Sequence, residues 1–400
     1  MSGAVAVVGA GLAGLGAVRA LRDQGYPGRI VLIGQEPHPP YDRPPLSKEF
    51  LAGVMPSEAL SLAAPQDAEL DVDMRTGARA IALHPAEREV ELDSGERVGG
   101  DGVVLATGAR PRTLPAPGAH HRPIRGVHTL RTVDDAISLR EVLVPGARLV
   151  VVGAGFIGAE VASTARGLGV EVVVVEVAAV PLAAALGEQL GAVCGALHAE
   201  HGVRLITGTG VERLLEDDAG RVRAILTADG REVAADAVLV AVGSVPNVEW
   251  LAGSGLRVED GVYTDAAGST GIPGVVATGD CARRFEPAAA GFVRQEHWTN
   301  AFQHPQSAVS ALLGTPPPAR GTTAVLPYFW SDQYGSRLQF AGHRMPGDAV
   351  DVVEGSLADR AFVAVYRRGG VAVAVLSMNN PRVFGRWRRE LAAALPVPAP

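Results

Sequence analysis

The chain contains one local pattern twice, and this repeat constrains its fold more than any other feature. In each copy an apolar run is followed by a glycine turn, GAGLAG at residues 9–14 and GAGFIG at residues 153–158. Each turn opens a helical stretch, and an acid, Glu36 or Glu176, follows a second apolar run about 20 residues later. This order is typical of a βαβ dinucleotide-binding unit. The sequence therefore predicts an α/β protein with two Rossmann-like domains.

The residue types of the pattern fit the phosphates and the sugar of a dinucleotide. The helix after the turn directs backbone N–H groups at a pyrophosphate, and the acid accepts hydrogen bonds from a ribose. The residues expected at the cofactors are Gly9, Gly11, Ala13, Gly14 and Glu36 in the first copy, and Gly153, Gly155, Gly158 and Glu176 in the second. A bound flavin and a visiting nicotinamide are the natural pair, because one passes a hydride to the other. The alternative is that both turns are ordinary βα connections.

The second acid also indicates which nicotinamide cofactor binds. Glu176 would repel the 2′-phosphate of NADPH, which in turn requires a nearby arginine or lysine. Residues 177–187 contain no basic side chain. The sequence therefore favours NADH.

Composition limits the other functions. A length of 400 residues suggests two or three domains, and 47% apolar with 20% charged residues is typical of a soluble globular protein. A net charge of −7 argues against nucleic acid as a partner. Two cysteines provide neither a disulfide framework nor a metal cluster, and we interpret the apolar N-terminus as a strand rather than a signal peptide. We expect a cytoplasmic protein that does not bind membranes.

The repeat also suggests where the domains divide. Residues 238–243 echo residues 103–108, and both segments end at a glycine, where a backbone approaches a ligand. Gly243 is therefore a further candidate for cofactor binding. We expect a discontinuous FAD-binding domain of residues 1–112 and 236–318, an NAD-binding domain of residues 113–235, and a C-terminal α+β domain of residues 319–400. Helices are expected near residues 187–201, 294–313 and 382–395, and C-terminal strands at 361–366 and 371–377.

The whole chain resembles the FAD-dependent pyridine nucleotide-disulfide oxidoreductases. Within them it resembles the ferredoxin reductases that serve bacterial aromatic-ring dioxygenases and cytochrome P450 systems. The resemblance depends on six segments, at residues 41–48, 105–108, 130–135, 277–280, 296–298 and 329–333. It implies a glutathione reductase-like fold with FAD and NADH as cofactors.

The resemblance assigns roles to three charged residues. It places Lys48, in the stiff RPPLSK loop of residues 43–48, beside the flavin ring, and Arg43 in the cofactor site. It places Glu160 near the nicotinamide and within reach of Lys48, so that the two pair across the domains. The alternatives are a solvated lysine on a proline turn, and a carboxylate that the helix dipole stabilises.

Other residues are assigned to FAD in the same way. Arg131 resembles an FAD-contacting arginine, and Asp280 an aspartate that hydrogen-bonds the ribitol. The alternative for Asp280 is a plain N-cap of the next helix, and the two roles are compatible because a helix starting there would point its positive end at the flavin. Trp298 falls at the pyrimidine edge of the flavin, and Trp330 resembles an aromatic residue at the electron exit. Ala80 stands where relatives more often have a valine that touches adenine.

The missing cysteines indicate how electrons leave. Residues 36–70 contain no cysteine, whereas disulfide reductases of this architecture carry one or two there. A dithiol relay is therefore unavailable. The resemblance implies an NADH:ferredoxin reductase that needs no metal of its own. It passes hydride from NADH to FAD and single electrons to an acidic [2Fe–2S] ferredoxin, which supplies an oxygenase.

Two groups of arginines suggest where that ferredoxin docks. Basic residues gather after Asp280 and on the last expected helix, at Arg283, Arg284, Arg382, Arg386, Arg388 and Arg389. A solvated helix face explains the second group equally well. Three other functions stay open: an NADH oxidase, a reductase of rubredoxin or a small molecule, and a redox-gated interaction flavoprotein.

Overall fold

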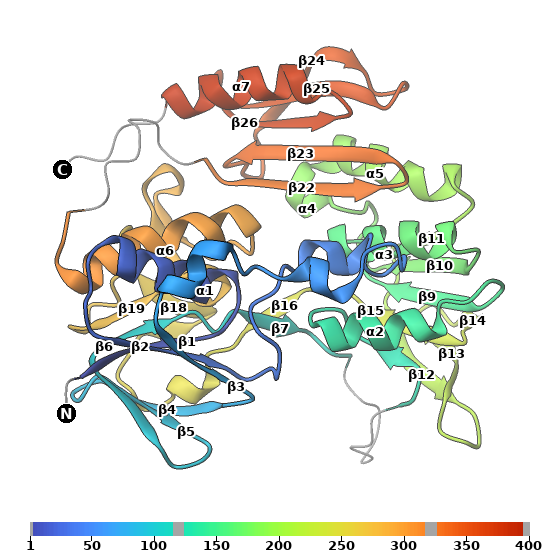
Figure 1. Ribbon diagram of the computed structural model, residues 1–400. Coiled ribbons are helices and arrows are strands. Elements are labelled where there is room, and N and C mark those ends of the chain that lie inside the picture. Colours follow the sequence, from blue (N-terminus) through green and yellow to red (C-terminus); the bar gives the residue numbers. More distant parts are fainter. Residues whose placement is uncertain (1–2, 115–123, 317–325, 395–400) are drawn as a thin grey trace.

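The computed structural model describes residues 3–114, 124–316 and 326–394. Two α/β domains lie side by side, and a third, C-terminal domain lies across the top of both in Figure 1. Within the described residues, no helix is both long and apolar enough to cross a membrane.

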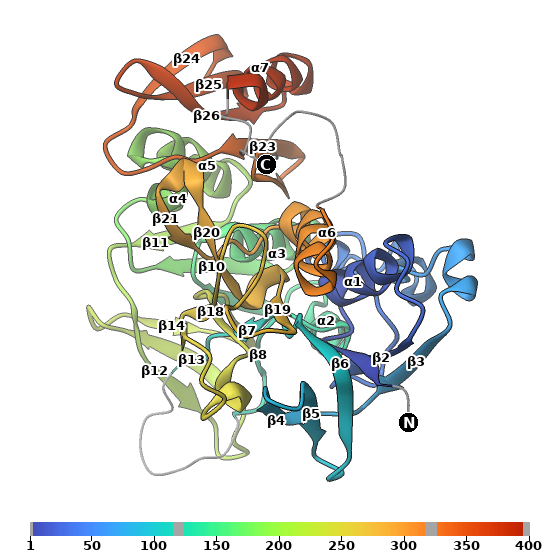
Figure 2. The same cartoon turned by 90° about the vertical axis from the view of Figure 1, so that its left-hand side faces the viewer.

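The first α/β domain is built on five parallel strands in the order β3-β2-β1-β6-β19. Their bounds are Val72–Thr76, Arg29–Gly34, Ala4–Val8, Arg97–Leu105 and Val275–Ala277. Helices α1 (Leu12–Asp23) and α6 (Trp298–Leu313) are distant in sequence but lie side by side on one face of this sheet (Figures 1 and 2). The opposite face packs against the meander of β4 (Ala80–His84), β5 (Glu89–Leu92) and β6.

The second α/β domain repeats this plan, with parallel strands in the order β11-β10-β9-β15-β8. Their bounds are Arg204–Thr207, Glu171–Glu176, Arg148–Val152, Ala237–Val240 and Val127–His128. The helices of this part of the chain are α2 (Val133–Val142), α3 (Phe156–Gly167), α4 (Ala183–Leu186) and α5 (Glu188–Glu200). The meander of β12 (Val211–Glu216), β13 (Val222–Thr227) and β14 (Glu232–Ala234) covers the other face. The predicted duplication is thus present.

Short strands connect the domains and extend the first one. β7 (Ala109–Pro111) pairs with β16 (Ser244–Pro246) where the chain crosses between domains. A four-stranded sheet contains β17 (Val258–Glu259), β18 (Gly261–Thr264), β20 (Ala282–Glu286) and β21 (Gly291–Val293).

The C-terminal domain is an antiparallel sheet in the order β22-β23-β26-β25-β24. The strands are Tyr328–Gln333, Ser336–Gly342, Val371–Met378, Ala361–Arg368 and Ala349–Ser356. Helix α7 (Pro381–Ala394) packs on it through buried Phe384 and Leu391. The sequence predicted β25, β26 and α7 but not the first three strands.

One sequence-based boundary is wrong, the alternative role of Asp280 as an α-helix N-cap is excluded, and one predicted helix begins later than expected. The domain boundary between residues 235 and 236 is misplaced, because β15 pairs with β9 inside the second sheet, and the chain returns to the first domain only at β16. No α-helix begins directly after Asp280, since residues 282–286 form β20, which pairs with β18. The helix expected from residue 294 begins at Trp298. The boundary expected between residues 318 and 319 lies outside the described residues.

The buried histidine of α5 predicts a pH-dependent stability. His198 is 1% exposed, and burial lowers the pKa of its imidazole to about 4. As the pH falls, the unfolded chain therefore binds a proton at this histidine before the folded chain does. The free energy of unfolding that is present above pH 6.5 is lost as the pH falls towards 4, by about 1.4 kcal/mol per pH unit. Denaturant unfolding at pH 7.5 and 5.0 should show this loss, and His198→Gln should reduce it. An equal pH dependence in His198→Gln would contradict the assignment.

Candidate functional site

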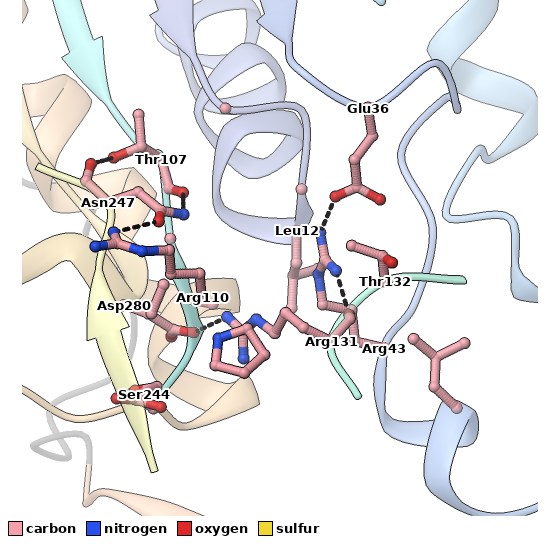
Figure 3. Close-up of a pocket in the computed structure, with 18 of the residues that line it drawn as sticks. Leu12, Glu36, Arg43, Thr107, Arg110, Arg131, Thr132, Ser244, Asn247 and Asp280 are labelled. Atoms are coloured by element: carbon pink, nitrogen blue, oxygen red, sulfur yellow. Dashed lines mark hydrogen bonds and ion pairs between the residues drawn. The ribbon is translucent and has the colours of Figure 1, made fainter. Parts of the chain in front are cut away.

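A cavity of about 1460 Å³ lies where the three domains meet. Figure 3 shows side chains that converge on it from the start of α1, the loop after β2 and the segment before α2. The predicted residues that line it are Gly9, Gly11, Ala13, Glu36, Arg43, Lys48, Ala80, Arg131, Gly155, Gly243, Asp280 and Trp298. Gly14, Gly153, Gly158, Glu160 and Glu176 are not among its lining residues.

The glycines of the first turn serve different purposes. Gly9 has a φ of +115°, and a Cβ there would lie 2.1 Å from the carbonyl oxygen of Ala106. A Cβ on Gly14 would lie 1.8 Å from the carbonyl oxygen of Gly9. Gly11 is the N-cap of α1, and a Cβ there would meet nothing within 4 Å. Gly9 and Gly14 therefore close the turn against the sheet, while Gly11 leaves open the space that a pyrophosphate fills.

The second turn has the same geometry. Gly153 has a φ of +103°, and a Cβ on Gly158 would lie 2.1 Å from its carbonyl oxygen. A Cβ on Gly155 would meet nothing within 4 Å. Both turns thus fit a dinucleotide.

The two acids that follow the turns are held differently. Glu36 Oε1 accepts from Arg43 Nη2 at 2.7 Å, as drawn in Figure 3, and its other oxygen accepts from the Tyr41 hydroxyl. Glu176 accepts from the backbone N–H groups of Ala154 at 2.7 Å and Ala178 at 2.8 Å. Glu176 therefore braces the second glycine turn, and a carboxylate has lone pairs left for a ribose.

Arg131 and Asp280 form an ion pair in the cavity wall. Arg131 Nη2 lies 2.6 Å from Asp280 Oδ2 (Figure 3). Burial alone would lower the pKa of the Arg131 guanidinium, but the Asp280 carboxylate more than offsets this and the pKa is raised. The pair joins the segment before α2 to the end of β19.

Lys48 and Glu160 form a second, more deeply buried ion pair. Lys48 Nζ lies 2.7 Å from Glu160 Oε2, and their side chains are 12% and 3% exposed. Lys48 follows a 3-10 turn at Pro44–Ser47, and its ammonium also donates to the carbonyl oxygen of Pro44. Glu160 lies on α3, behind Lys48 as seen from the cavity. The expected pairing across the two domains is therefore present, while the roles of both residues in the reaction remain predictions.

Aromatic side chains form the wall next to the C-terminal domain. Trp298 and Trp330 line the cavity with their ring centroids 6.2 Å apart. Trp298 Nε1 donates to Asp42 Oδ1 at 2.8 Å, and burial raises the pKa of that carboxyl although the bond opposes the shift. Trp330 stacks on Tyr328, with centroids 6.0 Å apart. The aromatic contacts thus continue from the cavity into the C-terminal domain.

Several site residues were not predicted from the sequence. Asn247 is bonded twice to Thr107, through its backbone oxygen at 2.7 Å and its side-chain nitrogen at 3.0 Å (Figure 3). Trp250 also lines the cavity. Ser331 donates to Glu160. Two of these residues, Thr107 and Ser331, lie in segments that carried the family resemblance, 105–108 and 329–333. Their hydrogen-bond partners lie 140 or more positions away in the sequence, and no local pattern indicates such a pairing.

The arginines of the expected docking patch differ in their exposure and in their contacts with aromatic rings. Arg284 is partly exposed, like Arg283, and burial lowers the pKa of its guanidinium. Arg283 lies over the ring of Tyr263. Arg386 and Arg389 are exposed on α7. Arg388 lies 4.4 Å above the ring of Tyr328.

Comparisons with known proteins cover nearly the whole chain. Residues 3–305 match the family described as pyridine nucleotide-disulphide oxidoreductase, and residues 328–400 match the family described as reductase C-terminal. The chain is 38% identical to rhodocoxin reductase of Rhodococcus erythropolis, covering 98% of this chain and 90% of that protein. It is 38% identical to the biphenyl dioxygenase system ferredoxin–NAD(+) reductase component of Paraburkholderia xenovorans (strain LB400), covering 99% and 94%. The crystal structure of a covalent putidaredoxin reductase–putidaredoxin complex matches with a TM-score of 0.92 and 35% identity, covering 99% and 94%.

Proposed function

The chain belongs to the pyridine nucleotide-disulphide oxidoreductase family, and from this premise we propose that it is an FAD-dependent NADH:ferredoxin reductase. One observation carries the proposal. A single cavity joins the open side of the first glycine turn to the start of α3 in the second domain. The two dinucleotides that the repeat predicts would thus share one space, in which a hydride could pass directly between them.

The residues present fit FAD. Gly11 and the N-terminus of α1 suit the pyrophosphate, Glu36 suits the ribose, and Ala80 lies where adenine is expected. Arg131 and Asp280 suit the ribitol, while Lys48 and Trp298 suit the flavin ring. FAD supplies the ability to accept a hydride and release electrons singly.

The chain's own contribution to the reaction is binding and orientation. Gly155 and Phe156 at the start of α3 line the cavity from the NAD side, so the nicotinamide enters there. Glu176 favours NADH. The Lys48–Glu160 pair fixes a positive charge at the cavity wall and ties the two nucleotide domains together at this point.

Anaerobic titration of the purified protein with NADH and then NADPH tests the function. A yellow protein whose flavin absorbance NADH bleaches quickly, and NADPH slowly, is expected. A protein that binds no FAD, or that neither nicotinamide reduces, would refute the proposal. Fast oxygen consumption without ferredoxin would indicate an NADH oxidase instead. We also propose a cytoplasmic location, which the free cysteines Cys194 and Cys281 support.

We propose an acidic [2Fe–2S] ferredoxin that supplies an oxygenase as the electron acceptor. It docks near Trp330, where Tyr328 and Arg388 extend the contacts from the cavity wall to α7. Arg283, Arg386 and Arg389 supply further positive charge. The printed names of the relatives, which include a ferredoxin reductase component and a complex with putidaredoxin, support this choice.

Charge reversal on α7 should weaken this docking. The double variant Arg386→Glu/Arg389→Glu should raise the KM for ferredoxin about tenfold at low salt and less at high salt, because exposed charges are screened. Steady-state kinetics with ferredoxin measure this, and turnover with ferricyanide should not change. The control Arg204→Glu/Arg213→Glu makes the same charge change at exposed sites of the NAD domain. An equal effect of the control would refute local docking.

A further inference from the structure

The first strand of the C-terminal domain runs along the helix that follows the second glycine turn. Three contacts join α3 to β22 and to Tyr334, the residue after this strand. They are Phe156 with Phe329, Glu160 with Ser331, and Ser163 with Tyr334. Positions 156, 160 and 163 have the spacing of one helix face, and positions 329 and 331 share one face of a strand. The C-terminal domain is thus fitted to this face of α3 rather than joined to it at a single point.

The middle contact completes the surroundings of a buried carboxylate. Glu160 Oε2 accepts from Ser47 Oγ at 2.6 Å and from Lys48 Nζ at 2.7 Å. Glu160 Oε1 accepts from Ser331 Oγ at 2.7 Å. Each of the three domains therefore supplies a group here: Ser47 and Lys48 come from the FAD domain, Glu160 from the NAD domain and Ser331 from the C-terminal domain. Ser331 is 0% exposed and Glu160 is 3% exposed.

A second buried side chain fixes the direction of the Ser331 hydroxyl. Gln333 Nε2 donates to Ser331 Oγ at 3.0 Å, and Gln333 is 1% exposed. A hydroxyl has one proton, and an amide nitrogen is only a donor. Ser331 therefore accepts from Gln333 and uses its proton for Glu160. The order of donation is Gln333 to Ser331 to Glu160.

We propose that Ser331, oriented by Gln333, is a positioning residue for the Lys48–Glu160 pair. With Oε1 held by Ser331, the carboxylate is fixed in rotation and Oε2 faces Lys48 Nζ. The strand that carries Ser331 also carries Trp330 in the cavity wall. The C-terminal domain thereby sets the nicotinamide side of the site as well as the proposed electron exit. This inference rests on the proposed function for its kinetic effect.

Ser331→Ala in the FAD-loaded protein tests the proposal. Anaerobic stopped-flow reduction by NADH should give an unchanged Kd for NADH and a limiting rate about tenfold lower, the effect of losing one hydrogen bond to a charged group. The flavin midpoint potential should become more negative, because a less firmly held Lys48 ammonium favours the added electrons less. Ser377→Ala is the matched control, since Ser377 is also 0% exposed in the same sheet, on β26.

A double-mutant cycle distinguishes positioning from general loss of packing. If Ser331 acts through Glu160, Ser331→Ala should have little further effect on rate or potential in a Glu160→Ala background. Equal effects in both backgrounds, or behaviour like that of Ser377→Ala, would overturn the inference. If NADH does not reduce the unmodified protein, the proposed function fails. The midpoint potential, which is measured without NADH, then still decides whether Ser331 positions Lys48.

Discussion

Gly11→Val should give a folded but colourless protein, whereas Gly155→Val should give a yellow protein that NADH hardly reduces. Both glycines are N-caps with extended backbone, and a Cβ at either position meets nothing within 4 Å. The first added carbon therefore meets no protein atom at either position. They fill the spaces that we assign to the pyrophosphates of FAD and NADH, respectively.

Absorbance and anaerobic reduction kinetics measure the two losses. Flavin content should fall nearly to zero in Gly11→Val. In Gly155→Val the flavin should remain, and the apparent Kd for NADH should rise about 100-fold, as expected when about 2.7 kcal/mol of binding is lost. Far-UV circular dichroism should match the unmodified protein in both. Flavin loss in Gly155→Val, or normal flavin content in Gly11→Val, would contradict the assignment of the two turns.

The third glycine of each turn provides the contrast. A Cβ on Gly14 or Gly158 would lie 1.8 or 2.1 Å from a backbone carbonyl oxygen. Gly14→Val and Gly158→Val should therefore reduce the yield of folded protein. Substitutions within one motif thus separate cofactor binding from folding.

Breaking the Lys48–Glu160 pair should cost the holoenzyme about 3 kcal/mol or more of unfolding free energy. Lys48→Met leaves Glu160, which is 3% exposed, without its cation. Glu160→Gln leaves the Lys48 ammonium without its anion. The double variant Lys48→Met/Glu160→Gln should lose less than the sum of the single variants, because it leaves neither charge unpaired. Hydride transfer should slow in both single variants.

Denaturant unfolding of the FAD-loaded variants measures the cost, with an exposed ion pair as control. Arg223 Nη1 lies 2.6 Å from Glu232 Oε1, a similar separation, but both side chains are about half exposed. Arg223→Met should therefore cost less than about 1 kcal/mol. Equal costs for Lys48→Met and Arg223→Met, or strict additivity in the double variant, would show that burial does not strengthen the Lys48–Glu160 pair.

Local sequence patterns were sufficient to predict the repeated elements of this protein. The apolar runs, the glycine turns and the acids follow one another within short segments, so they predict both parallel sheets and the residues nearest a dinucleotide. The helix at Glu188–Glu200 and the last two strands were found in the same way. The first three strands of the C-terminal domain, β22, β23 and β24, were not predicted.

The same local reasoning failed where the pairing between strands decides to which domain a segment belongs. Residues 238–243 were correctly matched to residues 103–108, but this likeness led to the wrong domain. Each segment forms the fourth strand of its own sheet. Pairing with β9, and not the likeness between the two sequences, assigns β15 to the second sheet.

The sequence by itself determined that the glycine-turn unit occurs twice, and it predicted which glycines and acids would serve the dinucleotides, because this pattern is local and its backbone requirements are strict. Only the tertiary structure decided how the parts act together. It turned Glu160 towards Lys48, set Ser331 of β22 on the other carboxylate oxygen, and joined Arg131 to Asp280. These contacts link residues that are more than 100 positions apart. Their formation depends on how the three domains pack, which no short segment encodes.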